Sequence, residues 1–120
     1  MIDHIHGTKV FHFPADGYSI DSERAATDVI GEVWLDWPDI AVIPVERFSD
    51  DFFMLDTRVA GDITQKFVTY GLRVALVGDI SEHLERSSAL TSYVRESNQG
   101  KHVWFVRDRD ELTERLRTAR

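Results

Sequence analysis

Two apolar runs separated by a helical pattern constrain the fold of this 120-residue chain more than any other feature. Residues 40–45 are apolar at every position, and residues 72–77 are apolar except at Arg73. Strands that are apolar on both faces are typical of parallel sheets covered by helices. Between the runs, a helical pattern extends from about Thr57 to Tyr70 and ends at Gly71, the usual residue after a helix. Residues 40–79 are therefore predicted to form one β-α-β unit.

The residues before this unit predict one strand and one helix. Residues 8–13 have the composition of a strand, and residues 2–5 can add a short extended piece. Ser22 or its neighbour Asp21 can cap a helix whose apolar residues recur at helical spacing up to Pro38. Pro44 cannot donate to a sheet ladder, so we expect it near the end of its strand or on an edge.

The residues after the unit continue the alternation of helices and strands. Asp79 and Glu82 have the spacing of a capping box, which opens a helix that ends before Gly100, with a break in its apolar spacing at Ser87. Residues 103–106 predict a last strand, and a final helix follows it. The predicted order β-α-β-α-β-α-β-α indicates one α/β domain over residues 1–120, with a largely parallel sheet and flanking helices.

Composition narrows the classes of partner and of chemistry. The formal net charge is −7, which disfavours nucleic acid and anionic membrane surfaces as partners. The absence of cysteine excludes thiol nucleophiles and cysteine-based zinc sites and fits a reducing compartment. The first residues lack the pattern of a signal peptide, and no apolar run approaches the length of a membrane span. We therefore expect a cytoplasmic protein.

The candidate site follows from the rule that ligands of open α/β sheets gather beyond the carboxyl ends of the strands. Here those ends carry residues 46–47, 78–79 and 107–108, and the helix start at residues 56–58 should lie beside the first two. A helix N-terminus favours anions, although Asp56, Thr57 and Asp79 can equally be ordinary helix caps. On the following helix, Gln65 and Lys66 can belong to a partner surface, and Lys66 stands four residues from Asp62, as in an ion pair. The candidate binding residues are Glu46, Arg47, Asp56, Thr57, Arg58, Gln65, Lys66 and Asp79.

Catalytic and metal motifs receive little support, and we expect no cofactor and no metal. Asp50, Asp51, Asp56 and Asp79 are carboxylates that can ligate magnesium, but their spacing matches no metal motif. There is no Gly-x-Ser-x-Gly elbow and no glycine-rich phosphate loop. Glu46 and Asp79 can form an acid/base pair only if burial separates their pKa values. The five histidines are expected to be isolated surface residues or part of a mobile N-terminus: His4, His6, His12, His83 and His102.

Three segments resemble a known family. Residues 52–67, Val77-Gly78-Asp79 and residues 96–100 are similar to domain-of-unknown-function family 4180, an uncharacterised bacterial family that implies no established activity. Leu55-Asp56-Thr57 also looks like the Asp-Ser segment of STAS domains, small α/β modules of the anti-sigma-factor-antagonist class with a similar element order. In that class a partner kinase phosphorylates the hydroxyl at the helix start. The resemblance implies that Thr57 is a switch residue.

Two classes of function remain open. The first is a non-enzymatic binding or regulatory module that acts through protein contact or a small ligand, with phosphorylation of Thr57 as a switch. The second is a small enzyme that acts on a polar or anionic substrate with carboxylate and arginine residues at the strand ends. An enzyme predicts a concave pocket on which Glu46, Arg47 and Asp79 converge. A switch module predicts an exposed Thr57 hydroxyl on a convex surface with no deep cavity. A homodimer is compatible with either class.

Overall fold

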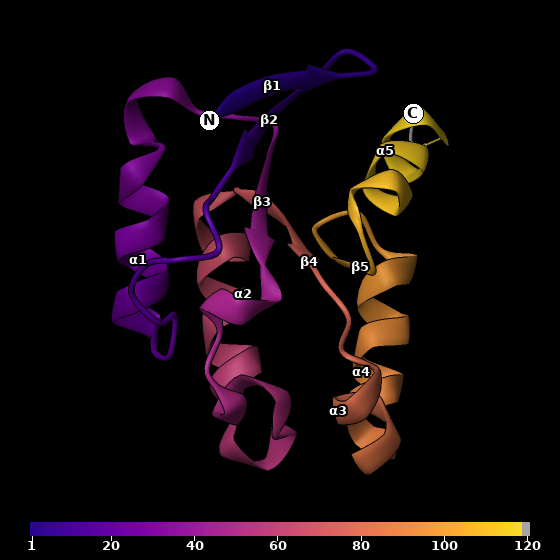
Figure 1. Ribbon diagram of the computed structural model, residues 1–120. Helices are drawn as coiled ribbons and strands as arrows, with labels where there is room; N and C mark the ends of the chain where they lie inside the picture. The colour runs from indigo at the N-terminus through magenta and orange to yellow at the C-terminus, as the bar shows by residue number, and fades with distance from the viewer. Residues whose placement is uncertain (119–120) are drawn as a thin grey trace.

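The computed structural model describes residues 1–118, which fold around a single five-stranded sheet with the strand order β1-β2-β3-β4-β5 (Figure 1). Strands β2 to β5 are parallel, and β1 is antiparallel to β2. The strands are β1 (Ile2–Ile5), β2 (Thr8–His12), β3 (Ile40–Pro44), β4 (Arg73–Val77) and β5 (Val103–Val106). The helices are α1 (Glu23–Glu32), α2 (Val59–Tyr70), α3 (Ser81–Arg86), α4 (Ser88–Gln99) and α5 (Arg109–Thr118). The predicted α/β class and mostly parallel sheet are confirmed.

The predicted strict alternation is wrong at two places. The N-terminal extended piece is a full strand, β1, which pairs with β2 through a tight turn at His6 and Gly7, both with positive φ. The third predicted helix is two helices, α3 and α4, which meet at Ser87. The Ser87 hydroxyl caps α4 by accepting a hydrogen bond from the Leu90 N–H at 3.0 Å. The break in apolar spacing at Ser87 therefore marks a helix start.

The strands that are apolar on both faces separate two hydrophobic cores. Ala41 and Ile43 of β3 face a large core that also contains the buried residues of α1, α2 and α4. Ile40 and Val42 face the other way, into a smaller core with Trp104 and the buried leucines of α5. Figure 1 shows α1 and α2 side by side, which agrees with the contacts between them. Because side chains alternate between the two faces of a strand, the runs are apolar on both faces, and Arg73 at the start of β4 is the exception.

The connection between β3 and α2 is built from short 3-10 turns. There are three of these turns, Val45–Arg47, Asp50–Phe53 and Leu55–Thr57. Arg58 then adopts a left-handed conformation, φ +66°, so α2 begins at Val59 and not at about Thr57 as predicted. Pro44 is the last residue of β3, which confirms the expectation for it.

No helix within residues 1–118 is long and apolar enough to cross a membrane.

Candidate functional site

A cavity of about 290 Å³ opens beyond the carboxyl ends of β4 and β5. Its floor is apolar, and Leu76, Phe105 and Val106 reach it from the two strands. Its rim is polar and carries Asp79 after β4 and Arg107 and Glu111 after β5. The remaining lining residues come from the β3 end, the connection after β4, α3 and α4: Val45, Gly78, Ile80, Ser81, Leu84, Val94 and Asn98. The cavity thus lies where the strand-end rule places ligands in open α/β sheets.

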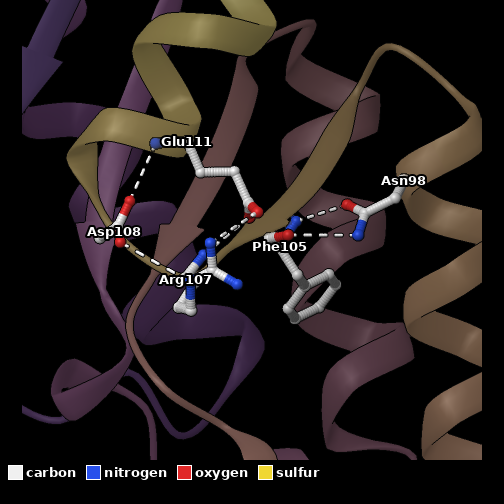
Figure 2. A network of polar contacts seen from close by, with 5 residues as sticks. All are labelled: Asn98, Phe105, Arg107, Asp108 and Glu111. Atoms are coloured by element: carbon white, nitrogen blue, oxygen red, sulfur yellow. Dashed lines mark hydrogen bonds and ion pairs between the residues drawn. The ribbon is translucent and has the colours of Figure 1, made fainter.

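The start of α5 forms one side of the rim, and Figure 2 shows its polar contacts. The Glu111 N–H donates to Asp108 Oδ1, and the Arg107 N–H donates to Glu111 Oε1, each at 2.9 Å. These bonds satisfy backbone donors that a helix start leaves unpaired. The guanidinium of Arg107 is held less closely, since its nitrogens lie 3.7 Å from Asp108 and 3.8 Å from Glu111. With its side chain 72% exposed, Arg107 keeps N–H donors that can bind a ligand.

Asn98 holds α4 against β5 at one side of the cavity. Its side-chain amide donates to the Phe105 carbonyl oxygen at 3.1 Å, and its Oδ1 accepts the Phe105 N–H at 2.7 Å (Figure 2). Arg115 of α5 adds a bond to the Asn98 carbonyl oxygen at 2.6 Å. The end of α4 is therefore joined to both β5 and α5, so the cavity has a firmly held wall.

Asp79 is an exposed carboxylate at the end of β4. Its Oδ1 accepts the Ser81 N–H at 2.9 Å, and this bond, with the Ser81 hydroxyl and the charge of Arg107, lowers the pKa of Asp79. Asp79 is therefore ionised at neutral pH. The predicted capping box with Glu82 is wrong, because Asp79 bonds two residues ahead and Ile80 stands at the cap position of α3.

Glu46 and Asp79 also line a second cavity, of about 280 Å³, on the neighbouring side of Asp79. Phe53 and His83 are among the other residues that line this cavity, and their rings are stacked with centroids 4.3 Å apart. His83 is half-buried by this contact, so the prediction of an isolated surface histidine is wrong. A third cavity, of about 370 Å³, shares Phe53 and His83 and brings in Asp56. Of the candidate residues, Glu46, Asp56 and Asp79 thus lie around one continuous stretch of surface at this end of the sheet.

Arg47 lies apart from these cavities. It is buried, with only 3% of its surface exposed, and it donates to the Tyr18 carbonyl oxygen at 3.0 Å and the Pro14 carbonyl oxygen at 3.1 Å. Its guanidinium also stands over the Tyr18 ring. Arg47 therefore holds the loop before α1, and the convergence with Glu46 and Asp79 that an enzyme predicts is not formed.

The hydroxyl of Thr57 is fully engaged although the residue is exposed. Thr57 Oγ1 donates to the carbonyl oxygens of Asp51 and Met54, both at 2.7 Å, and accepts the Val59 N–H at 3.3 Å. It thereby closes the turn before α2. Arg58, beside it, is exposed and lines none of the three cavities described above.

Gln65 and Lys66 lie on α2, away from these cavities. Gln65 donates to Thr69 on the same helix at 3.4 Å. Lys66 pairs with Glu23 at the start of α1, at 3.6 Å, so the predicted ion pair with Asp62 is wrong. A contact between two helices determines this pairing, and spacing within α2 alone could not reveal it.

Sequence reasoning missed three residues of the main cavity, Arg107, Glu111 and Asn98. The strand-end rule does point to residues 107–108, but the set of candidate binding residues leaves out Arg107. Glu111 had a weaker signal, since its spacing from Asp108 indicates a cap and not a rim. Within residues 1–118 no group of three or more histidine and acidic residues is placed to hold a metal ion.

Comparison with known proteins identifies a family but no activity. A family model described as a domain of unknown function (DUF4180) matches residues 5–116. No curated protein and no solved structure matches the chain. The chain therefore belongs to the DUF4180 family.

Proposed function

We propose that this DUF4180 domain is a non-enzymatic module that binds a small molecule in the cavity beyond β4 and β5. One observation carries the proposal: the cavity combines an apolar floor with a rim that holds both a cation and carboxylates. Binding sites for small molecules have this combination of apolar lining and a few converging polar groups. The ligand class is a small molecule with an apolar body and a charged or strongly polar head.

The rim determines how such a ligand would be oriented. Arg107 offers unused N–H donors, so it binds an anionic or carbonyl group of the ligand. Asp79 and Glu111 offer carboxylate oxygens that accept hydrogen bonds from an amine or hydroxyl. The apolar body of the ligand would be buried against Leu76 and Phe105 at the floor, and this burial would stabilise the complex. No nucleophile or acid/base pair is needed for this role.

A thermal-shift screen tests the proposal. A ligand at about ten times its Kd stabilises a protein by about 1.4 kcal/mol, which raises the Tm of a domain of this size by roughly 5 °C. The screen should compare apolar amino acids with the matching acids and amines that lack one charged group. Val94→Phe, which fills the floor, and Arg107→Gln, which removes the rim cation, should abolish the shift produced by any hit.

Arg95→Gln is the matched control, because Arg95 is an exposed arginine of α4 that does not line the cavity. A hit whose shift survives both Val94→Phe and Arg107→Gln would place its binding site elsewhere and contradict the proposal.

The other parts of the functional hypothesis are proposals of the same kind. We also propose a regulatory role through a protein partner, a cytoplasmic location, a bacterial origin and a STAS-like relationship. The sheet supports the STAS-like relationship, since its strands lie in chain order and helical segments connect each pair of parallel strands from β2 to β5. Phosphorylation of Thr57 stays a prediction, and a phosphate there would have to displace two backbone carbonyl contacts.

A further inference from the structure

The opposite end of the sheet carries an aromatic cluster that the proposed function does not use. Trp34 and Trp37 lie in the connection that leads into β3, and Tyr70 is the last residue of α2, just before β4. Because β3 and β4 are neighbouring parallel strands, these residues meet at the amino end of the sheet. A cavity of about 430 Å³ is lined by Trp34, Trp37 and Tyr70.

Two of the three rings are in edge-to-face contact. Trp34 and Trp37 have ring centroids 5.7 Å apart and planes at 87°, so two indoles meet almost at a right angle. Tyr70 supplies the third ring from a different element. Trp34 is 62% exposed and Tyr70 is 44% exposed, values far above those of core aromatic residues such as Trp104 at 1%. Trp34 and Tyr70 therefore present free ring surface to a ligand, whereas Trp37 is half-buried against the large core.

The chemistry of this surface favours a cation. An aromatic face carries negative charge density, and tryptophan binds cations more strongly than other aromatic residues do. Within residues 1–118, arginines stand over Tyr18 and Trp104, whereas no cation of the chain stands over Trp34, Trp37 or Tyr70. The net charge of −7 favours the approach of a cation to the protein.

We propose that Trp34, Trp37 and Tyr70 form an aromatic cage that binds an alkylated ammonium group of a small free molecule, such as choline. Methyl groups spread the ammonium charge over an apolar surface, which fits a site made of rings. A small free ligand fits a cavity of about 430 Å³ that three side chains line. The site is independent of the cavity beyond β4 and β5.

Tryptophan indole signals in a two-dimensional ¹H–¹⁵N NMR titration with choline test the cage directly. The chain has three tryptophans, and Trp104 serves as an internal control because it is buried with its indole N–H bonded to the Gly100 carbonyl oxygen. The signals of Trp34 and Trp37 should move and saturate, while that of Trp104 stays in place. The neutral isostere 3,3-dimethylbutan-1-ol should bind at least about fivefold more weakly, since it lacks the charge.

Variants separate the cage from a general apolar patch. Trp34→Leu and Tyr70→Leu should each weaken choline binding at least about fivefold, and Trp34→Phe should weaken it less. Leu35→Ala is the matched control, since Leu35 is 99% exposed in the same segment and does not line the cavity. This variant should bind choline as the unmodified protein does.

Three results would overturn the assignment. Equal affinity for the neutral isostere would show an apolar patch without cation recognition. Movement of the Trp34 and Trp37 signals with protein concentration alone would show that a second copy of the chain covers the rings. Much tighter binding of a peptide with trimethyllysine than of choline would replace the small free ligand by a protein partner. Failure of the cage leaves the thermal-shift test of the other cavity unaffected.

Discussion

The two ends of the sheet use their side chains in different ways. At the carboxyl end, most polar groups bond to nearby backbone: Asn98 to Phe105, Glu111 to Arg107 and Asp79 to Ser81. At the amino end, Trp34 and Leu35 are largely exposed to solvent. Many polar side chains at this end therefore hold its own loops and helix starts, whereas the guanidinium of Arg107 is largely exposed. A dense polar cluster in a sequence first indicates where the backbone needs partners.

This comparison predicts that substitutions at the carboxyl end reduce stability even without a ligand, whereas substitutions at the amino end do not.

Gly78→Ala should have the largest effect. Gly78 has φ +150°, and a Cβ there would lie 2.3 Å from Val45 Cγ2. Backbone strain and the displacement of Val45 should cost about 2–4 kcal/mol of unfolding free energy, measured by urea denaturation. Gly61→Ala, inside α2 with open space around it, is the control and should add about 0.5–1 kcal/mol. Unchanged stability of the Gly78→Ala variant would mean that the carboxyl end of the sheet tolerates rearrangement.

Asn98→Ala should come next, with a loss of about 2 kcal/mol. The substitution leaves the N–H and the carbonyl oxygen of Phe105 without their side-chain partner at a half-buried position. Gln99→Ala, at the exposed next residue, should change the unfolding free energy by less than about 0.5 kcal/mol. Equal effects of the two substitutions would mean that the Asn98 side chain makes no specific contribution to stability.

Thr57→Val should cost about 1 kcal/mol, because it removes the hydroxyl that closes the turn before α2. Thr57→Ser keeps the hydroxyl and should retain most of the stability. Urea denaturation of the two variants measures the difference. If Thr57→Val is as stable as the unmodified protein, the hydroxyl is free for other use, and the phosphorylation prediction gains support.

His12 should make a smaller contribution that depends on pH. His12 is buried at the end of β2, and burial, followed by the charge of Arg109, lowers its pKa, while Asp3 partly opposes this. The unfolded chain therefore binds a proton before the folded one does as pH falls. The stability from neutral His12 is fully present above about pH 6.5 and is lost as the pH falls below that value.

Urea midpoints at pH 7.5 and pH 5 measure this effect when the unmodified protein is compared with His12→Leu, in which other groups titrate as before. The unmodified protein should lose more stability between the two pH values. Parallel losses would show that His12 takes no part in the pH dependence.

Trp34→Leu should have the smallest effect on stability, below about 0.5 kcal/mol, because Trp34 is 62% exposed. Thermal or urea denaturation tests this for the same variant used in the choline titration. A large loss of unfolding free energy would mean that the amino-end rings belong to the core packing, so that both ends of the sheet contribute to stability.

The sequence predicted the fold better than the site, for physical reasons. The runs that form β3 and β4 had to be apolar on both faces, so periodicity was sufficient to identify them. Arg47 illustrates the limit, since its place is set by carbonyl oxygens of Pro14 and Tyr18 about 30 positions earlier in the chain. Asp79 and Glu46 were found because the strand-end rule depends only on local order. Trp34 is 62% exposed, and its residue type alone would suggest a place in the core.

The contact between Asn98 and Phe105 has a further consequence for solubility. β5 lies at the edge of the sheet and is formed by Val103–Val106, four apolar residues. An apolar edge strand with free N–H and carbonyl groups is a template for pairing with another molecule. The Asn98 amide occupies one N–H and one carbonyl oxygen of this edge, as a further strand would. The Asn98 side chain thus disfavours edge-to-edge aggregation of the sheet.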